Sequence, residues 1–231
     1  MFPEAESQSL LQINLDGPRR PPASGGRPKK LVIFLHGYGS NGEDLMGLAS
    51  QWARDLPDVQ FVSPNAPRPV PGHPSGFQWF PLTRIDPAET ERGAKMAGPV
   101  LDSFIDAELH RYQLSPRDLA LVGFSQGTMM ALHVGMRRKQ ALAGVLGYSG
   151  ALAGREALKS EIRSRPPVFL IHGDQDDVLP PGFLFDACDG LNEAGASAQW
   201  HLSQGVPHGI GPDGLELGGR FLGKVLSGRY A

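Results

Sequence analysis

The sequence predicts one doubly wound α/β domain, in which a mostly parallel sheet carries helices on both faces. Three observations lead to this fold class. Short aliphatic runs alternate with longer amphipathic segments along most of the 231 residues. The runs are apolar at successive positions, as strands buried on both faces are. The chain is 40% hydrophobic, which is enough for one sizeable core.

Composition and charge exclude several other classes of protein. Lys and Arg number 22 against 24 Asp and Glu, so the net charge of -2 gives no reason to expect a nucleic acid partner. The one cysteine, Cys188, excludes an internal disulfide and a cysteine-rich metal site. No apolar run approaches the roughly 20 residues of a membrane-spanning helix, and the acidic start is atypical of a signal peptide. We therefore expect a soluble, cytoplasmic protein with no stable membrane insertion.

Six runs are expected to form the sheet because they are rich in aliphatic and β-branched residues. They are Leu31–Leu35, Val59–Ser63, Leu119–Val122, Leu142–Tyr148, Val168–Ile171 and Ala198–Leu202. Segments with helical spacing separate them, with an apolar stripe over Leu101–Tyr112 and further helices expected at Gln126–Lys139, Gly182–Ala194 and Gly214–Leu226. Because ligands bind at the carboxyl ends of the strands in such sheets, the chemistry should follow the apolar runs.

Residues 1–30 are expected to precede the core as an edge strand and a loop. Leu10–Leu15 has the composition of an antiparallel edge strand. Gly17–Lys30 holds five basic residues, no acid, and Pro or Gly at seven positions, which predicts a flexible surface loop. A basic arm that grips nucleic acid is the alternative, but this segment has no aromatic residues to stack on bases.

The strongest chemical signal follows the run Leu119–Val122. Gly123-Phe124-Ser125-Gln126-Gly127 matches G-x-S-x-G between a predicted strand and a predicted helix. In that context the motif forms a sharp turn that exposes a nucleophilic serine hydroxyl. The two glycines leave room where strand and helix cross, and the helix N-terminus favours developing negative charge. Ser125 is therefore the predicted nucleophile.

A serine nucleophile needs a base and an orienting carboxylate, which in this architecture follow in the order serine, acid, histidine. An acid-rich turn after the fifth run offers Asp174, Asp176 and Asp177 as candidates for the acid. His208 lies in a Gly- and Pro-rich loop after the sixth run and is the candidate base. Each group thus follows a separate strand, and the joint agreement predicts a catalytic triad.

Structural or surface roles are expected for His73, His110, His133 and His201. His172 directly precedes the acid-rich turn, and we expect it to pack against the backbone. No pair of histidines has metal-ligand spacing, and Cys188 lies within a predicted helix, so neither a metal nor another cofactor is expected.

A glycine-rich loop after Leu31–Leu35 is predicted to contribute to an oxyanion hole. Gly37, Gly39 and Gly42 would let this loop fold back and aim a backbone N–H at the serine. The residue after the nucleophile, Gln126, supplies a second N–H. A phosphate-binding loop is the alternative, but the sequence here matches neither a P-loop nor a full dinucleotide fingerprint.

Taken together, these motifs resemble the carboxylesterase/phospholipase family of α/β-hydrolases, which includes acyl-protein thioesterases and small bacterial carboxylesterases. The resemblance covers residues 31 to about 225, and residues 66–84 look more like the bacterial esterases. It implies an α/β-hydrolase fold with a small cap or none, Asp176 as the acid, and the Tyr38 and Gln126 amides as the oxyanion hole. The matching segments are Phe34–Gly39, Pro64–Pro67, Trp79–Phe80, Gly123–Gly127, His172–Pro180 and Pro207–His208.

The resemblance implies a serine carboxylesterase that forms an acyl-enzyme on Ser125 and acts on short- to medium-chain esters. Trp79, Phe80, Phe124 and Leu179 are expected to line an apolar acyl pocket. The alternatives are a lysophospholipase or acyl-protein thioesterase with the same triad, and a non-catalytic binding protein with this fold. The expected partner is a small-molecule acyl ester or thioester, and an exposed apolar surface would also support a homodimer.

Overall fold

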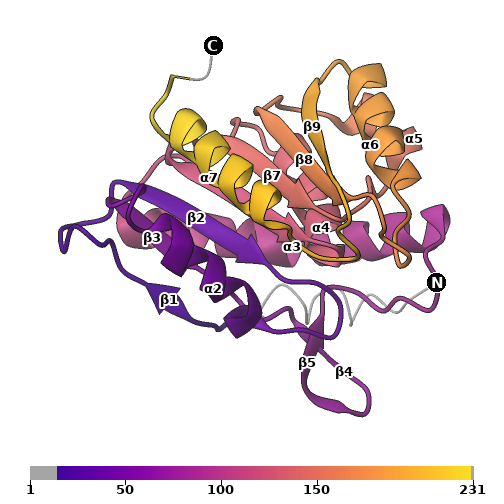
Figure 1. The fold of residues 1–231 in the computed structure, drawn as a ribbon, viewed down its shortest axis with the longest axis horizontal. Helices are drawn as coiled ribbons and strands as arrows, with labels where there is room; N and C mark the ends of the chain where they lie inside the picture. The colour runs from indigo at the N-terminus through magenta and orange to yellow at the C-terminus, as the bar shows by residue number, and fades with distance from the viewer. Residues whose placement is uncertain (1–14, 230–231) are drawn as a thin grey trace.

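The computed structural model describes residues 15–229. A seven-stranded sheet of order β1-β3-β2-β6-β7-β8-β9 runs through its centre (Figure 1). Neighbouring strands pair in parallel, except that β1 runs antiparallel to β3. The predicted mostly parallel sheet is therefore confirmed. Its strands are β1 (Arg19–Arg20), β2 (Lys30–Leu35), β3 (Val59–Val62), β6 (Leu119–Phe124), β7 (Gly144–Tyr148), β8 (Val168–Gly173) and β9 (Ala198–Ser203).

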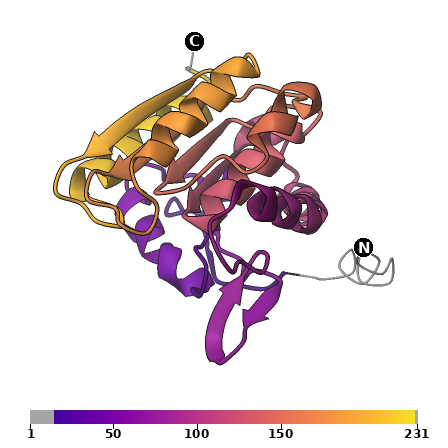
Figure 2. The same ribbon diagram turned by 90° about the vertical axis from the view of Figure 1, so that its right-hand side faces the viewer.

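Helices cover both faces of this sheet (Figure 2). Strand β2 shows how the layers arise, because successive side chains point to opposite faces. Leu31, Ile33 and Leu35 join the apolar cluster under α3, α4, α5 and α6, whereas Val32 and Phe34 join the cluster under α2 and α7. The helices are α2 (Gly42–Trp52), α3 (Pro87–Tyr112), α4 (Gln126–Arg137), α5 (Arg155–Glu161), α6 (Gly182–Glu193) and α7 (Pro212–Leu226), with a 3-10 turn, η1, at Pro116–Asp118.

Several elements differ from the sequence predictions. A two-stranded hairpin, β4 (Arg68–Val70) and β5 (His73–Gln78), protrudes from the body of the molecule (Figures 1 and 2). Helix α3 begins well before the predicted apolar stripe, because Asp86 caps it by accepting hydrogen bonds from the Ala88 and Glu89 amides at 3.0 Å. Helices α2 and α5 were not predicted either.

The N-terminal segment is more engaged with the core than its composition predicts. The predicted strand Leu10–Leu15 lies outside the described residues except for Leu15, which is buried. Within the described residues, an antiparallel edge strand is formed by β1, which lies in the segment predicted to be a flexible loop. All five basic side chains of this segment contact groups of the same chain, three of them carboxylates and two of them neutral side chains. The pairs are Arg19–Glu108, Arg20–Ser50, Arg27–Gln113, Lys29–Asp58 and Lys30–Asp118.

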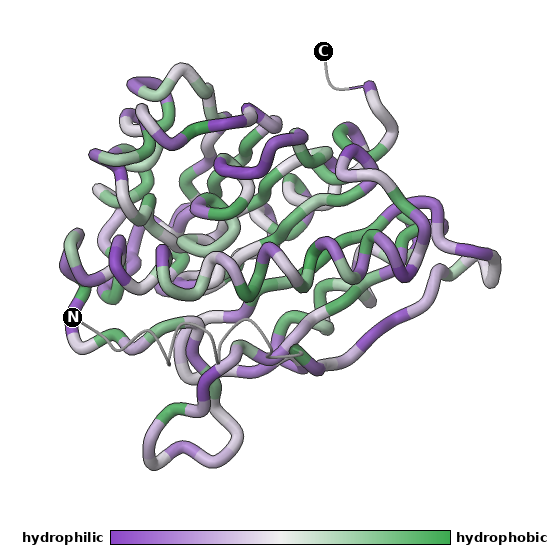
Figure 3. The backbone as a smooth tube through the Cα atoms, turned by 180° about the vertical axis from the view of Figure 1, so that it is seen from behind, coloured by the Kyte–Doolittle hydropathy of each residue, from purple (hydrophilic) through white to green (hydrophobic). Residues whose placement is uncertain are grey.

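The two edges of the sheet differ in length and in side chains. Strand β1, at one edge, is two residues long, whereas β9, at the other, has six. Trp200 of β9 is 53% exposed and packs edge-on against Phe185 of α6. Figure 3 shows hydrophobic segments running through the middle of the molecule. Within residues 15–229, no helix combines the length and hydrophobicity needed to cross a membrane.

Candidate active site

Ser125 occupies a strained turn between β6 and α4. Its backbone has φ 53° and ψ -116°, a conformation that a non-glycine residue adopts only when its surroundings enforce it. A Cβ at Gly127 would lie 1.8 Å from the Leu35 carbonyl oxygen, and one at Gly123 would lie 2.4 Å from the Thr128 nitrogen. The two glycines of the motif therefore permit the close crossing of strand and helix, as the sequence predicts.

Hydrogen bonds hold Ser125 in this turn. Its amide donates to the Tyr148 carbonyl of β7 at 2.9 Å, and its own carbonyl accepts from the Thr128 amide at 2.9 Å. The Thr128 hydroxyl also donates to the Tyr148 carbonyl at 2.9 Å. Although Ser125 is the N-cap residue of α4, its side chain makes no capping hydrogen bond. The backbone is thus fixed while the hydroxyl is left for chemistry.

Of the three candidate aspartates, Asp176 is the one that contacts His208. Its carboxylate is buried, and Oδ1 accepts hydrogen bonds from the Val178 amide at 3.0 Å and the Leu179 amide at 2.8 Å. The other oxygen, Oδ2, lies 2.7 Å from His208 Nδ1. Asp174 instead accepts from the Gly205 amide at 2.6 Å, and Asp177 is exposed to solvent.

His208 lies in the loop between β9 and α7, next to the serine turn. Its ring centroid is 5.0 Å from that of Phe124, the residue before Ser125. Its loop is tied to the acid-rich turn because the Gln175 amide donates to the Val206 carbonyl at 3.0 Å. With Nδ1 engaged by Asp176, Nε2 is the ring nitrogen that remains to accept a proton.

The glycine-rich loop after β2 lies against the serine turn. A Cβ at Gly37 would be 3.1 Å from the Phe124 ring and 3.4 Å from Ser125 Cβ. The far end of the loop is joined to the protruding hairpin, because the Gly39 amide donates to the Phe77 carbonyl at 2.9 Å and the Phe77 amide donates to the Ser40 carbonyl at 2.7 Å. The Gly37–Tyr38 peptide thus lies beside Ser125, while the Tyr38 side chain is 45% exposed.

A buried histidine that the sequence analysis assigned no role fixes this peptide. His36 Nδ1 lies 2.7 Å from the Gly37 carbonyl, and Nε2 lies 2.9 Å from the Ala66 amide. A carbonyl only accepts and an amide only donates, so Nδ1 carries the hydrogen and Nε2 is bare. Burial lowers the pKa of His36, which favours this neutral form. Since the C=O and N–H of a trans peptide point in opposite directions, holding the Gly37 oxygen also aims the Tyr38 N–H.

The Gln126 side chain has a bracing role of its own. Its Oε1 accepts from the Trp79 amide at 2.9 Å, and its Nε2 donates to the Phe80 carbonyl at 2.8 Å. Trp79 Nε1 in turn donates to the His36 carbonyl at 3.0 Å. The backbone amide of Gln126 opens α4 at the site, where helix amides lack partners within the helix. No sequence pattern could have revealed these side-chain contacts between distant segments.

The acyl pocket predicted from aromatic residues needs correction. Trp79 and Phe80 are 0% exposed and Leu179 is 1% exposed, and all three belong to the apolar core. They pack beneath the site because Gln126 and His36 tie Trp79 and Phe80 down, and they have no surface to offer a substrate. Phe124, by contrast, is partly exposed and lies against His208.

Comparisons with known proteins place the chain in a family. A sequence model described as phospholipase/carboxylesterase matches residues 22–226. Acyl-protein thioesterase 1 of Mycosarcoma maydis is 29% identical over 227 residues, covering 89% of this chain and 95% of that protein. Acyl-protein thioesterase 1 of Gibberella zeae is 26% identical over 212 residues, covering 84% of this chain and 90% of that protein.

A solved structure extends the match to three dimensions. The crystal structure of esterase PE8 has a TM-score of 0.88 and 44% sequence identity, covering 93% of this chain and 100% of that one. The fold, the serine turn and the family match agree with one another. The chain therefore belongs to the phospholipase/carboxylesterase family of α/β-hydrolases, serine hydrolases that cleave ester or thioester bonds.

Proposed function

We propose that the chain is a serine carboxylesterase that hydrolyses short- to medium-chain esters through an acyl-enzyme on Ser125. The observation that carries this proposal is the 2.7 Å contact between His208 Nδ1 and Asp176 Oδ2 beside the strained serine turn. His208 Nε2 takes the proton of the Ser125 hydroxyl as its oxygen attacks the acyl carbon. Asp176 holds the imidazole in the required tautomer and stabilises its charged form.

The rest of the cycle follows from the same groups. The Tyr38 and Gln126 amides hold the negative oxygen of the tetrahedral intermediate. As the intermediate collapses, His208 returns the proton to the departing alcohol or thiol. A water molecule then gives a proton to His208 and attacks the acyl-enzyme, which releases the carboxylic acid and restores the Ser125 hydroxyl.

Labelling with a fluorophosphonate tests this proposal at the nucleophile. We expect a single covalent adduct, detected by intact mass, on the wild-type chain and on Ser160→Ala, in which an exposed serine far along the chain is removed as a control. Ser125→Ala should gain no adduct and lose measurable turnover of p-nitrophenyl butyrate. An unlabelled, folded wild-type chain would contradict the proposal and favour a non-catalytic binding protein.

A surface groove of about 440 Å³ replaces the buried aromatics as the proposed site for the acyl chain. It is lined in part by Ile85, Ala151, Leu152 and Phe183. Its Ala151 end follows Gly150, where a Cβ would lie 3.0 Å from the Ser125 carbonyl oxygen. Charged side chains such as Glu91, Arg155 and Asp186 line the rest of it, so the acyl chain is expected at the Ala151 end, next to the serine turn.

Filling the groove tests this assignment. Ala151→Trp should lower kcat/KM for p-nitrophenyl octanoate about tenfold, because a buried acyl tail of this length is worth more than 1.4 kcal/mol. The acetate ester, which is too short to enter the groove, should change less than about twofold. Equal losses on both esters would place the acyl chain elsewhere.

Thioester hydrolysis is the second candidate function, because the relatives named above are acyl-protein thioesterases. Matched butyryl oxygen and sulfur esters with the same leaving-group skeleton would separate the two. Comparable kcat/KM on both substrates, with a preference for long acyl chains, would favour the thioesterase. A preference for the oxygen ester with short chains supports the carboxylesterase.

A further inference from the structure

Besides the partly exposed His208, a buried imidazole contacts the carboxylate of Asp176. His172, near the end of β8, is 2% exposed. Its Nε2 lies 2.7 Å from the Leu179 carbonyl oxygen and 3.2 Å from Asp176 Oδ2. Because a carbonyl oxygen can only accept, Nε2 carries a hydrogen that both oxygens share. His172 is therefore held in the Nε2–H form.

This contact completes a set of four donors around one buried carboxylate. The amides of Val178 and Leu179 occupy Oδ1, so the turn after Asp176 fixes that oxygen. Two imidazoles share Oδ2, with His208 at 2.7 Å and His172 at 3.2 Å. The Asp176 side chain is 0% exposed, so these donors take the place of water around its charge.

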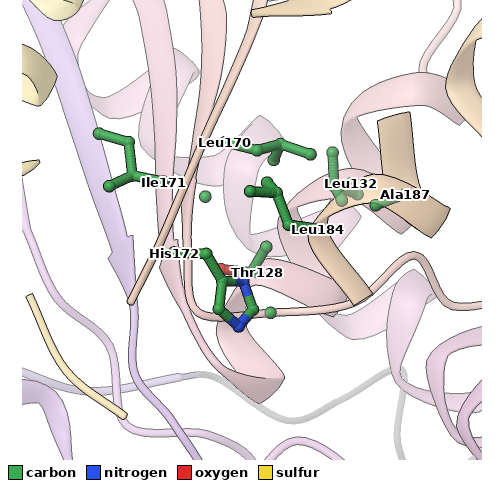
Figure 4. A pocket seen from close by; sticks show the side chains of 9 residues that line it. Thr128, Leu132, Leu170, Ile171, His172, Leu184 and Ala187 are labelled. Carbon is green, nitrogen blue, oxygen red and sulfur yellow. The ribbon is translucent and has the colours of Figure 1, made fainter. Parts of the chain in front are cut away.

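Among the described residues that line the cavity beside His172, no other side chain has a free donor to replace its N–H. The ring borders a small cavity of about 10 Å³ (Figure 4), which is close to the space of one water molecule. The cavity wall is mostly aliphatic, with Leu132, Leu170 and Leu184 among its members. Thr128 also lines it, but its hydroxyl already donates to the Tyr148 carbonyl at 2.9 Å.

We infer that His172 is a positioning residue, whose Nε2–H closes the Asp176–Leu179 turn and holds Asp176 Oδ2 where His208 meets it. The inference rests on the proposed function, because it concerns the acid of the same triad. By donating to the Leu179 carbonyl and to Oδ2 together, His172 ties the end of the turn to its first side chain. The rigid position of His172 in β8, opposite Leu202 of β9, fixes the carboxylate relative to the sheet.

Substitution of His172 by glutamine or by asparagine, whose side-chain amides differ in length, provides the test. In His172→Gln the side-chain amide reaches the position of Nε2, whereas in His172→Asn it stops near the position of Nδ1. Both replacements are polar and uncharged, so they share the cost of burial and differ in the donor. We expect His172→Asn to lower kcat on p-nitrophenyl butyrate about tenfold, the value of one hydrogen bond to a charged group, with KM changed less than twofold.

His172→Gln should retain kcat within about threefold of the wild type. The rate of fluorophosphonate labelling at Ser125 should follow the same order, because labelling needs an activated serine but no ester binding. His133→Asn is the matched control, since it removes an imidazole that is 5% exposed from a groove with no residue of the triad in its lining. Its kcat should equal that of the wild type.

The outcomes distinguish a failure of the positioning role of His172 from a failure of the proposed carboxylesterase function. Equal kcat for the Gln and Asn variants, whether both are unimpaired or both are equally impaired, overturns the positioning role. The same holds for a loss confined to KM. Thermal unfolding of each variant shows whether the compared samples are folded at the assay temperature. If the wild-type chain itself resists labelling, the proposed function fails instead, and it fails whatever the His172 variants do.

Discussion

The two loops that flank Ser125 are each held by a buried imidazole, but in opposite tautomers. On the side of the proposed oxyanion hole, called the oxyanion side below, His36 donates from Nδ1 to the carbonyl of its neighbour Gly37. On the acid side, His172 donates from Nε2 to Leu179 and Asp176, which follow it at a distance of several residues. Nδ1, the ring nitrogen nearer the backbone, thus binds the adjacent peptide in His36. Nε2, the more distant ring nitrogen, reaches across a turn in His172.

The two tautomers differ because the two loops orient different groups, a backbone N–H in one and a side-chain carboxylate in the other. The oxyanion side directs a backbone N–H, and one fixed peptide plane is enough for that. The acid side directs a side-chain carboxylate, whose two oxygens must be held separately. Asparagine keeps a donor near the position of Nδ1, and glutamine keeps one near the position of Nε2. The two substitutions should therefore rank in opposite order of kcat in the two loops.

The largest effect is expected on the acid side. Asp176→Asn should lower kcat on p-nitrophenyl butyrate about 10⁴-fold, because an amide can no longer hold His208 in the tautomer that accepts the serine proton. The fold should persist, since the amide oxygen can still accept from the Val178 and Leu179 amides. Steady-state kinetics and circular dichroism of the purified variant check both points.

The control for this assignment is the next residue. Asp177 is exposed, and Asp177→Asn should change kcat less than about twofold, as surface substitutions away from the chemistry do. A loss at Asp177 as large as that at Asp176 would move the catalytic acid along the turn and undo the comparison of the two loops.

Acid should weaken the fold through buried neutral histidines. Burial lowers the pKa of His133 to about 4 from an ordinary value of 6.5, and burial lowers that of His36 as well. The unfolded chain therefore binds protons below pH 6.5 that the folded chain does not yet bind. Folded stability should fall as pH drops from 6.5 to 4, by about 3 kcal/mol from His133 alone. For His36, protonating Nε2 would also set it against the Ala66 N–H.

Urea unfolding of the wild type and of His133→Leu at pH 7 and pH 4.5 measures this dependence. The variant should lose less stability between the two pH values than the wild type does. Parallel losses would mean that His133 is charged in the folded state. The residues of the proposed triad are the same in both proteins, so their contribution cancels in the comparison, which tests the burial of His133 independently of turnover.

The smallest effect on kcat is expected for substitutions of His36 on the oxyanion side. There the Asn and Gln variants should rank in the reverse of their order at His172. His36→Asn keeps a donor near the position of Nδ1, whereas His36→Gln moves it to the longer arm. We expect kcat of His36→Gln to be about tenfold lower than that of His36→Asn. The reason is that a misdirected Tyr38 N–H loses part of its contact with the oxyanion. If the Asn and Gln variants ranked in the same order of kcat at His36 and at His172, the proposed difference between the two loops would be wrong.

Local patterns predicted the sheet and the sharp turn at Ser125 well. Apolar runs marked the positions of the parallel strands, and G-x-S-x-G marked the turn at Ser125, because strand burial and close crossing leave traces in adjacent residues. The hairpin β4–β5 was missed, since Pro, Gly and Ser within β5 depress strand propensity. Its pairing with Ser40 is a tertiary contact.

The parts of the site that could not be predicted depend on contacts between distant segments. Trp79 and Phe80 have the composition of a pocket wall, and only the bonds from the Gln126 side chain reveal that they are held in the core. Likewise, His36 and His172 look alike in sequence, each before a glycine. Their different tautomers depend on which carbonyl the fold brings within reach.

The unequal edges of the sheet bear on how molecules of this chain meet at high concentration. An exposed strand edge can extend a sheet into a neighbouring molecule and so begin aggregation. The two residues of β1 are too short for that, and their arginines are engaged by Glu108 and Ser50. Strand β9 has six residues and an exposed Trp200, and no other strand of residues 15–229 pairs with its outer edge. A lysine at position 200 would therefore be the first change to make for a more soluble enzyme.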